Sequence, residues 1–136
     1  MKKNKKKNHG QEEVKKCSNC FKSRHIVFSF AYLTYKKDFG KREAEVFFNR
    51  MIELSNVNYL TLRKLQKSVG FEEERLEIKK EIPSEFEEDI EIFDGKYTVI
   101  RLYKNNIPTP GRIIGKLVNK VFYIFYIDVK GELYKH

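Results

Sequence analysis

The side chains that could do chemistry lie mainly in the last 40 residues, from Tyr97 to His136. There, short runs of Val, Ile, Tyr and Phe are interrupted by cationic and titratable residues. A basic, aromatic sheet is typical of a nucleic-acid-binding surface. The alternative is a half-solvated sheet whose outward residues happen to be cationic. The candidate residues for nucleic-acid contact are Arg101, Tyr103, Lys104, Arg112, Lys116, Tyr134 and His136.

A second group of possible ligands lies near the N-terminus, where Cys17 and Cys20 precede His25. The spacing matches the first three ligands of a zinc knuckle. A closed structural zinc site needs four ligands, and Phe30 stands where the fourth is expected. Two interpretations stay open: a zinc site completed from elsewhere, or two reduced thiols near the start of a strand. Two cysteines this close do not form a disulfide framework. Because no Walker or metal-finger motif is complete, we expect no cofactor.

Charge is distributed very unevenly along the chain of 136 residues, whose net charge is +9. Residues 1–24 carry +7, residues 71–92 carry −7, and the two remaining stretches are basic. We expect 1–24 to be a disordered basic tail that contains the two cysteines and 25–136 to be one domain. The tail is either merely solvated or adds sequence-independent attraction to phosphates. Its first lysines are Lys2, Lys3, Lys5, Lys6 and Lys7.

The acidic segment at 71–92 has three possible roles. It could form a solvated face, supply carboxylates for acid–base or divalent-metal chemistry, or lie against the basic tail or sheet and screen its charge. The chain has no apolar run of membrane-spanning length and no apolar signal-peptide core. We therefore expect a soluble cytoplasmic protein without membrane contact.

The first half of the chain predicts a strand followed by two helices. His25 to Leu33 is apolar on both faces, which predicts a central or doubly covered strand. A helix is expected from about Lys41 to Ser55, and a second one from about Asn56 or Asn58 to Ser68. The second helix has a basic face that is either solvated or contacts nucleic acid. The first should bury a stripe formed by Ala44, Phe47, Phe48, Met51 and Ile52.

The second half predicts an antiparallel meander. A short strand near Leu76 to Ile82 should end at Pro83, with a short helix or loop from Ser84. Strands then follow over Tyr97–Tyr103, Arg112–Val118 and Val121–Asp128, the last one central. Glu132–His136 could form a final short strand. The predicted fold class is α+β: an N-terminal strand, two helices, then an antiparallel meander of three to four strands.

The order of these elements over residues 25–136 resembles that of the RelE/ParE toxin superfamily. The local likeness lies in the Tyr-Thr-Val-Ile-Arg-Leu strand, in Gly-Arg112-Ile-Ile-Gly beside Val-Phe-Tyr-Ile-Phe-Tyr-Ile-Asp, and in the closing Leu-Tyr134-Lys-His136. The chain departs from the family pattern in its long acidic segment, in its N-terminal extension and at Asp128-Val-Lys-Gly, where many members have a basic cluster.

The RelE branch cuts mRNA on the ribosome without metal, and the ParE branch inhibits DNA gyrase. The resemblance implies that Arg112 holds the scissile phosphate. It also implies that Tyr134 or His136 orients or protonates groups at the 2′-OH and the leaving oxygen, with Arg101 as a further phosphate ligand. RNA or the ribosome, and a protein antitoxin, would then be the partners.

Three functions stay open at this point. The first is a toxin-type RNA endonuclease. The second is a non-enzymatic protein that binds nucleic acid or a nucleoprotein, such as a phage- or defence-related inhibitor. The third is an interaction domain whose acidic segment binds a basic partner.

Overall fold

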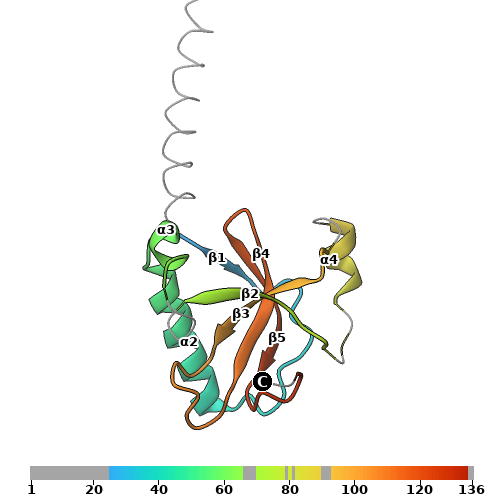
Figure 1. Cartoon of the computed structure of the whole chain (residues 1–136). Helices are drawn as coiled ribbons and strands as arrows, with labels where there is room; N and C mark the ends of the chain where they lie inside the picture. The colour runs from blue at the N-terminus through green and yellow to red at the C-terminus, as the bar shows by residue number, and fades with distance from the viewer. Residues whose placement is uncertain (1–24, 66–69, 79, 81, 90–92, 135–136) are drawn as a thin grey trace, which may run out of the picture.

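A mixed five-stranded sheet, in the order β1-β5-β4-β3-β2, forms the centre of an α+β fold (Figure 1). The computed structural model describes residues 25–65, 70–78, 80, 82–89 and 93–134. No helix in these ranges is long and apolar enough to cross a lipid bilayer. The elements are β1 (Val27–Ser29), α2 (Lys41–Ser55), α3 (Tyr59–Leu62), β2 (Phe71–Arg75), α4 (Ser84–Asp89), β3 (Lys96–Arg101), β4 (Arg112–Val118) and β5 (Val121–Asp128).

The strands from β2 to β5 pair antiparallel, and β1 joins β5 in parallel. The predicted two-residue turn between β4 and β5 is confirmed. Asn119 and Lys120 both have positive φ, 50° and 66°, as the common two-residue hairpin turn requires. A bulge in β4 falls between Ile114 and Gly115. The carbonyl oxygen of Tyr123 approaches Gly115 so closely that no Cβ fits there, which explains the glycine.

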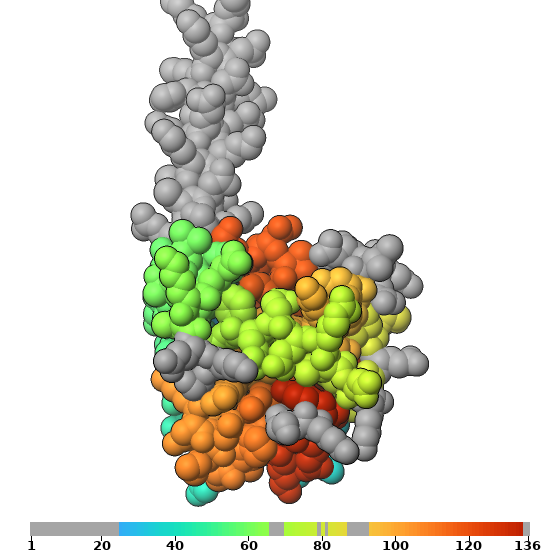
Figure 2. Space-filling model, viewed as in Figure 1, coloured from blue at the N-terminus to red at the C-terminus, as the bar shows by residue number. Residues whose placement is uncertain are grey.

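Apolar residues cover both faces of the sheet. On one face, Phe47 and Leu54 of α2 pack with Ile113 and with the rest of one core cluster. On the other, Phe86 of α4 and the C-terminal Leu133 belong to a second cluster. β2 and the segment after it lie across the middle of the view in Figure 2, in yellow-green. Double coverage accounts for the apolar run in β5, which lies inside the sheet as predicted.

The prediction of a long central first strand is wrong. β1 has three residues and lies at the edge of the sheet. The chain turns at Ala31 and Tyr32, and it then meets β5 again through Thr34 and an isolated bridge from Tyr35. The apolar run that begins at His25 therefore contacts β5 twice, first through β1 and then through Thr34 and Tyr35.

The prediction for α2 is right in its bounds and partly right in its buried face, because Phe47 and Met51 are buried as predicted. Phe48 and Ile52 are 63% and 45% exposed. The buried face includes Leu54 and Arg50 instead. The Arg50 guanidinium donates from Nε to the carbonyl oxygen of Arg101 at 2.9 Å. Arg50 therefore lies on the face of α2 that is turned towards the sheet. Phe48 lies on the outer face of the helix.

Three further predictions differ from the structure. The second helix is only α3, with Asn58 as its N-cap; residues 66–69 lie outside the described ranges. The strand predicted near Leu76–Ile82 is wrong in place, because the glutamates of β2 pair with β3 instead. Residues 132–134 form no strand, and 135–136 are not described. A short helix beginning at Ser84 is confirmed.

Candidate functional site

Three of the residues predicted to bind phosphate or act in catalysis are close to one another. Arg112 pairs with Arg101 on β3 and with Asp128 on β5, and paired residues of neighbouring strands point to the same face. The carboxylate of Asp128 accepts N–H groups from Glu132 and Leu133, both at 2.9 Å. These bonds fix the segment that carries Tyr134, whose phenol lies close enough to the Arg112 guanidinium to feel its charge.

The side chain of Arg112 is nevertheless already engaged in hydrogen bonds within the protein. Its side chain is buried, with 7% exposed. The Nη1 atom donates to Asn106 Oδ1 at 2.8 Å and to the carbonyl oxygens of Pro110 and Gly111 at 3.1 and 3.0 Å. The guanidinium thus joins the middle of the loop between β3 and β4 to its C-terminal end. It could contact a phosphate only by giving up some of these bonds.

The remaining predicted cations of the sheet are also paired internally. Arg101 donates from Nη1 to the carbonyl oxygen of Lys104 at 3.0 Å, and Lys104 forms an ion pair with Glu53 at 2.6 Å. Lys116 contacts Glu73 and Asp94, each at 3.1 Å, with 12% of its side chain exposed. A hydrogen bond from the Lys96 backbone, aided by Lys116, lowers the pKa of Asp94.

The predicted tyrosines lie against different core clusters. Tyr103 packs beside the cluster that contains the buried residues of α2, whereas Tyr134 packs beside the cluster that contains Phe86. Burial raises the pKa of both phenols. Arg112 opposes this rise at Tyr134, while Glu74 and Glu72 add to it. Tyr134 therefore stays protonated at neutral pH and can donate a hydrogen bond or a proton.

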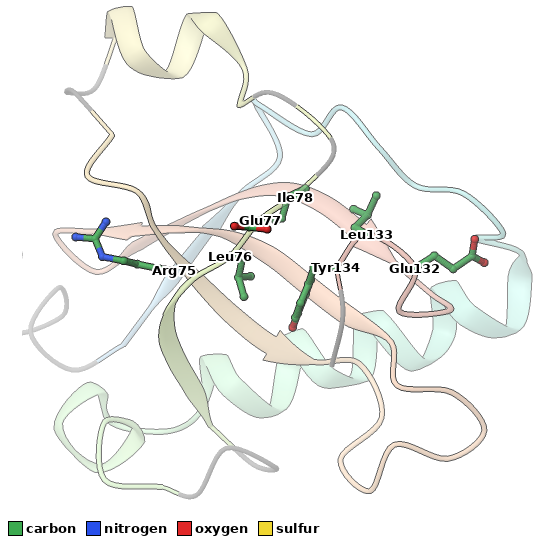
Figure 3. Close-up of a pocket in the computed structure, with 7 residues that line it drawn as sticks. All are labelled: Arg75, Leu76, Glu77, Ile78, Glu132, Leu133 and Tyr134. Carbon is green, nitrogen blue, oxygen red and sulfur yellow. The ribbon is translucent and has the colours of Figure 1, made fainter.

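A pocket of about 600 Å³ opens beside Tyr134 (Figure 3). Leu76, Ile78 and the Glu77 carboxylate lie near its centre, and the side chains of Arg75 and Glu132 extend away from it in opposite directions. The volume suits a small organic ligand. The carboxylates at its rim, with Glu72 and Glu74 close to Tyr134, oppose an anion there. The lining residues are Arg75, Leu76, Glu77, Ile78, Glu132, Leu133 and Tyr134.

Several predicted residues lie outside the described ranges, so their roles stay predictions. His25 is described and half-buried just before β1. Within the described part of the chain, no group of three or more His, Cys, Asp or Glu side chains could hold a metal ion. The residues without a described position are Lys2, Lys3, Lys5, Lys6, Lys7, Cys17, Cys20 and His136.

A different cationic surface, which we name the α3 end, consists of Tyr59, Arg63, Lys64 and Lys120. Lys120 Nζ lies 5.2 Å from the centre of the Tyr59 ring, and Arg63 Cζ lies 6.0 Å from it. Val27 donates its N–H to the Lys120 carbonyl oxygen at 3.0 Å, so β1 begins at the same place. In Figure 1, α3 and the β4–β5 turn lie at the same end of the molecule.

Comparison of the chain with models of known families, with curated proteins and with solved structures gives no match. The fold stands as α+β with a mixed five-stranded sheet. Two surfaces of this fold could carry a function: the Arg112–Tyr134 region and the α3 end.

The two surfaces differ in charge. The Arg112–Tyr134 region is surrounded by carboxylates of β2 and of the C-terminal segment. The α3 end is built from stretches that contain no Asp or Glu, namely residues 54–71 and 95–127. The sequence shows these acid-free stretches. Only the structure shows that they come together around Tyr59. The α3 end is thus the more cationic of the two surfaces.

Proposed function

We propose that this protein binds nucleic acid without cleaving it, through the α3 end and the lysine-rich N-terminal segment. The observation that carries the proposal is the position of Lys120 and Arg63 at the Tyr59 ring, on a surface built from acid-free stretches. Both cations therefore lie beside the same ring. Such cations release condensed counterions when they neutralise phosphates, and this release drives sequence-independent binding.

The N-terminal segment would add to the same interaction. Residues 1–24 contain nine Lys or Arg and two Glu, and they lead directly into β1 beside Lys120. A basic segment joined to a basic surface gives a strong dependence on salt concentration, because each phosphate contact adds to the slope. The RelE/ParE likeness of the element order is compatible with a nucleic-acid ligand, but the proposal does not depend on it.

The test is fluorescence anisotropy with a labelled 20-nucleotide oligomer at several KCl concentrations. Replacing Arg63 and Lys120 by Ala should weaken binding several-fold and reduce the salt slope by about 1 to 2. The matched control replaces Lys37 and Lys130, which form surface ion pairs with Glu132 and Asp38. It removes the same charge and should leave binding nearly unchanged. Equal losses in both double variants, or no binding by the wild type, would contradict the proposal.

A second candidate is a RelE-like RNA endonuclease, favoured by the proximity of Arg112 to Tyr134 beside the pocket. In this mechanism Tyr134 or His136 would transfer protons, and the Arg112 guanidinium would stabilise charge on the phosphate. An RNA-cleavage assay with and without ribosomes tests it. Cleavage by the wild type that Tyr134→Phe and His136→Ala each reduce about a hundredfold would establish this candidate and remove the non-enzymatic one.

A further inference from the structure

Two phenylalanine rings remain on the surface near the sheet edge formed by β1. Phe30, which follows β1, is 53% exposed, and Phe48, on the outer side of α2, is 63% exposed. The Phe30 ring packs on Phe47 at a centroid distance of 5.9 Å. Phe47 is buried, contacts Phe39 at 5.6 Å, and directly precedes Phe48. Phe30 is therefore supported by a buried aromatic ring, and Phe48 follows that ring in the helix and points outward.

The two segments that carry these rings, residues 25–37 and α2, have no net negative charge. Residues 25–37 contain Lys36 and Lys37 and no carboxylate, and Lys37 is paired with Glu132. On α2, Glu43 accepts the N–H of Gly40 at 3.0 Å, and Glu53 is paired with Arg50 and Lys104. The charge of Glu53 is thus balanced by two cations, whereas Glu43 keeps its negative charge. Glu45 is the exposed carboxylate on the same side of α2 as Phe48.

The rings also lie close to the α3 end along the chain. Phe48 is seven residues before the end of α2, about 10 Å at the helical rise, and α3 begins four residues later at Tyr59. α2 and α3 occupy the same side of the molecule (Figure 1). Exposed aromatics and phosphate-binding cations therefore share one side of the protein.

We infer that this surface binds single-stranded nucleic acid, with unpaired bases stacked on Phe30 and Phe48 and phosphates at the α3 end. The inference rests on the proposed function and names the form of nucleic acid. A duplex hides its base faces, whereas a single strand exposes them, and stacking on aromatic side chains tolerates any sequence. Stacking also gives the exposed rings a role that phosphate contacts alone do not.

Binding of labelled dT20 is compared with binding of a 20-base-pair duplex at a fixed 100 mM KCl. The wild type should bind dT20 at least tenfold more tightly. Phe30→Ala and Phe48→Ala should each weaken dT20 binding at least fivefold, about 1 kcal/mol, and leave duplex binding unchanged. The control is Ile107→Ala, which shortens another exposed apolar side chain, 68% exposed, in the β3–β4 loop. It should change neither affinity.

A direct measurement uses the absence of tryptophan from the chain. In Phe48→Trp the new indole is the only one, so its fluorescence reports on position 48. Quenching by dT20 but not by the duplex supports stacking. Unquenched fluorescence at saturating dT20, or equal losses for both ligands in the alanine variants, overturns the inference and leaves the proposed function standing. Failure of the wild type to bind either ligand overturns both.

Discussion

Replacing Arg112 by Ala should cost this protein much of its stability, because Arg112 is a structural anchor in the free protein. The guanidinium is buried and donates to one side-chain oxygen and two backbone carbonyl oxygens. Its charge also acts on the nearby phenol of Tyr134. The alanine variant removes all of these bonds together and leaves the loop carbonyls without their donor.

The expected loss follows from the number and type of these bonds. A hydrogen bond that involves a charged group contributes about 1.5–3 kcal/mol. The three bonds are not additive, and removing a buried charge relieves its desolvation. We therefore expect the free energy of unfolding to fall by about 3 kcal/mol. For a domain of this size that corresponds to a decrease in Tm of roughly 10 °C.

Urea denaturation followed by circular dichroism measures the loss. Arg63→Ala is the matched control, because Arg63 is exposed and its guanidinium lies over the Tyr59 ring at the surface; its loss should stay below about 1 kcal/mol. If Arg112→Ala unfolds within about 1 kcal/mol of the wild type, the anchoring role is wrong. The result also decides how a loss of activity in this variant is interpreted, since an unfolded protein says nothing about catalysis.

Three other outcomes follow from the packing. Gly115→Ala should not yield folded protein, because the new Cβ would overlap the carbonyl oxygen of Tyr123; a soluble variant with native circular dichroism would contradict this. Thr98→Val should lower the free energy of unfolding by about 1–3 kcal/mol in urea titrations, because the Leu117 N–H loses its acceptor; an unchanged midpoint would argue against it. Burial raises the pKa of Tyr126 above its ordinary value near 10, so the folded state binds more protons at high pH. The free energy of unfolding should stay level to about pH 9 and fall above about pH 10, and Tyr126→Phe should reduce that fall; equal slopes in the two proteins would refute the assignment.

Local signals determined the elements that the sequence predicted well. The amphipathic run after Gly40 gives α2 its bounds, and the Asn119-Lys120 pair gives the hairpin its turn. Both depend on residues within a few positions of one another, so backbone preferences and periodicity suffice. The same holds for β3, β4 and β5, whose apolar runs are separated by turn residues.

Contacts between distant segments decided the rest. The glutamates of β2 joined the sheet edge because Glu73 meets Thr98 and Lys116 across the strands. Lys104 was similarly paired with Glu53 on α2. A charge count shows which cations exist, and only the fold shows which of them a carboxylate already neutralises.

The candidate site shows the same division. The sequence by itself determined that the chain is basic, that it contains acid-free stretches, and that α2 is rich in apolar residues. Only the tertiary structure decided that Arg112 is buried, that Lys120 lies at Tyr59, and that Phe48 faces outward. The physical reason is that periodicity fixes the width of an apolar face, whereas exposure depends on where the neighbouring elements end.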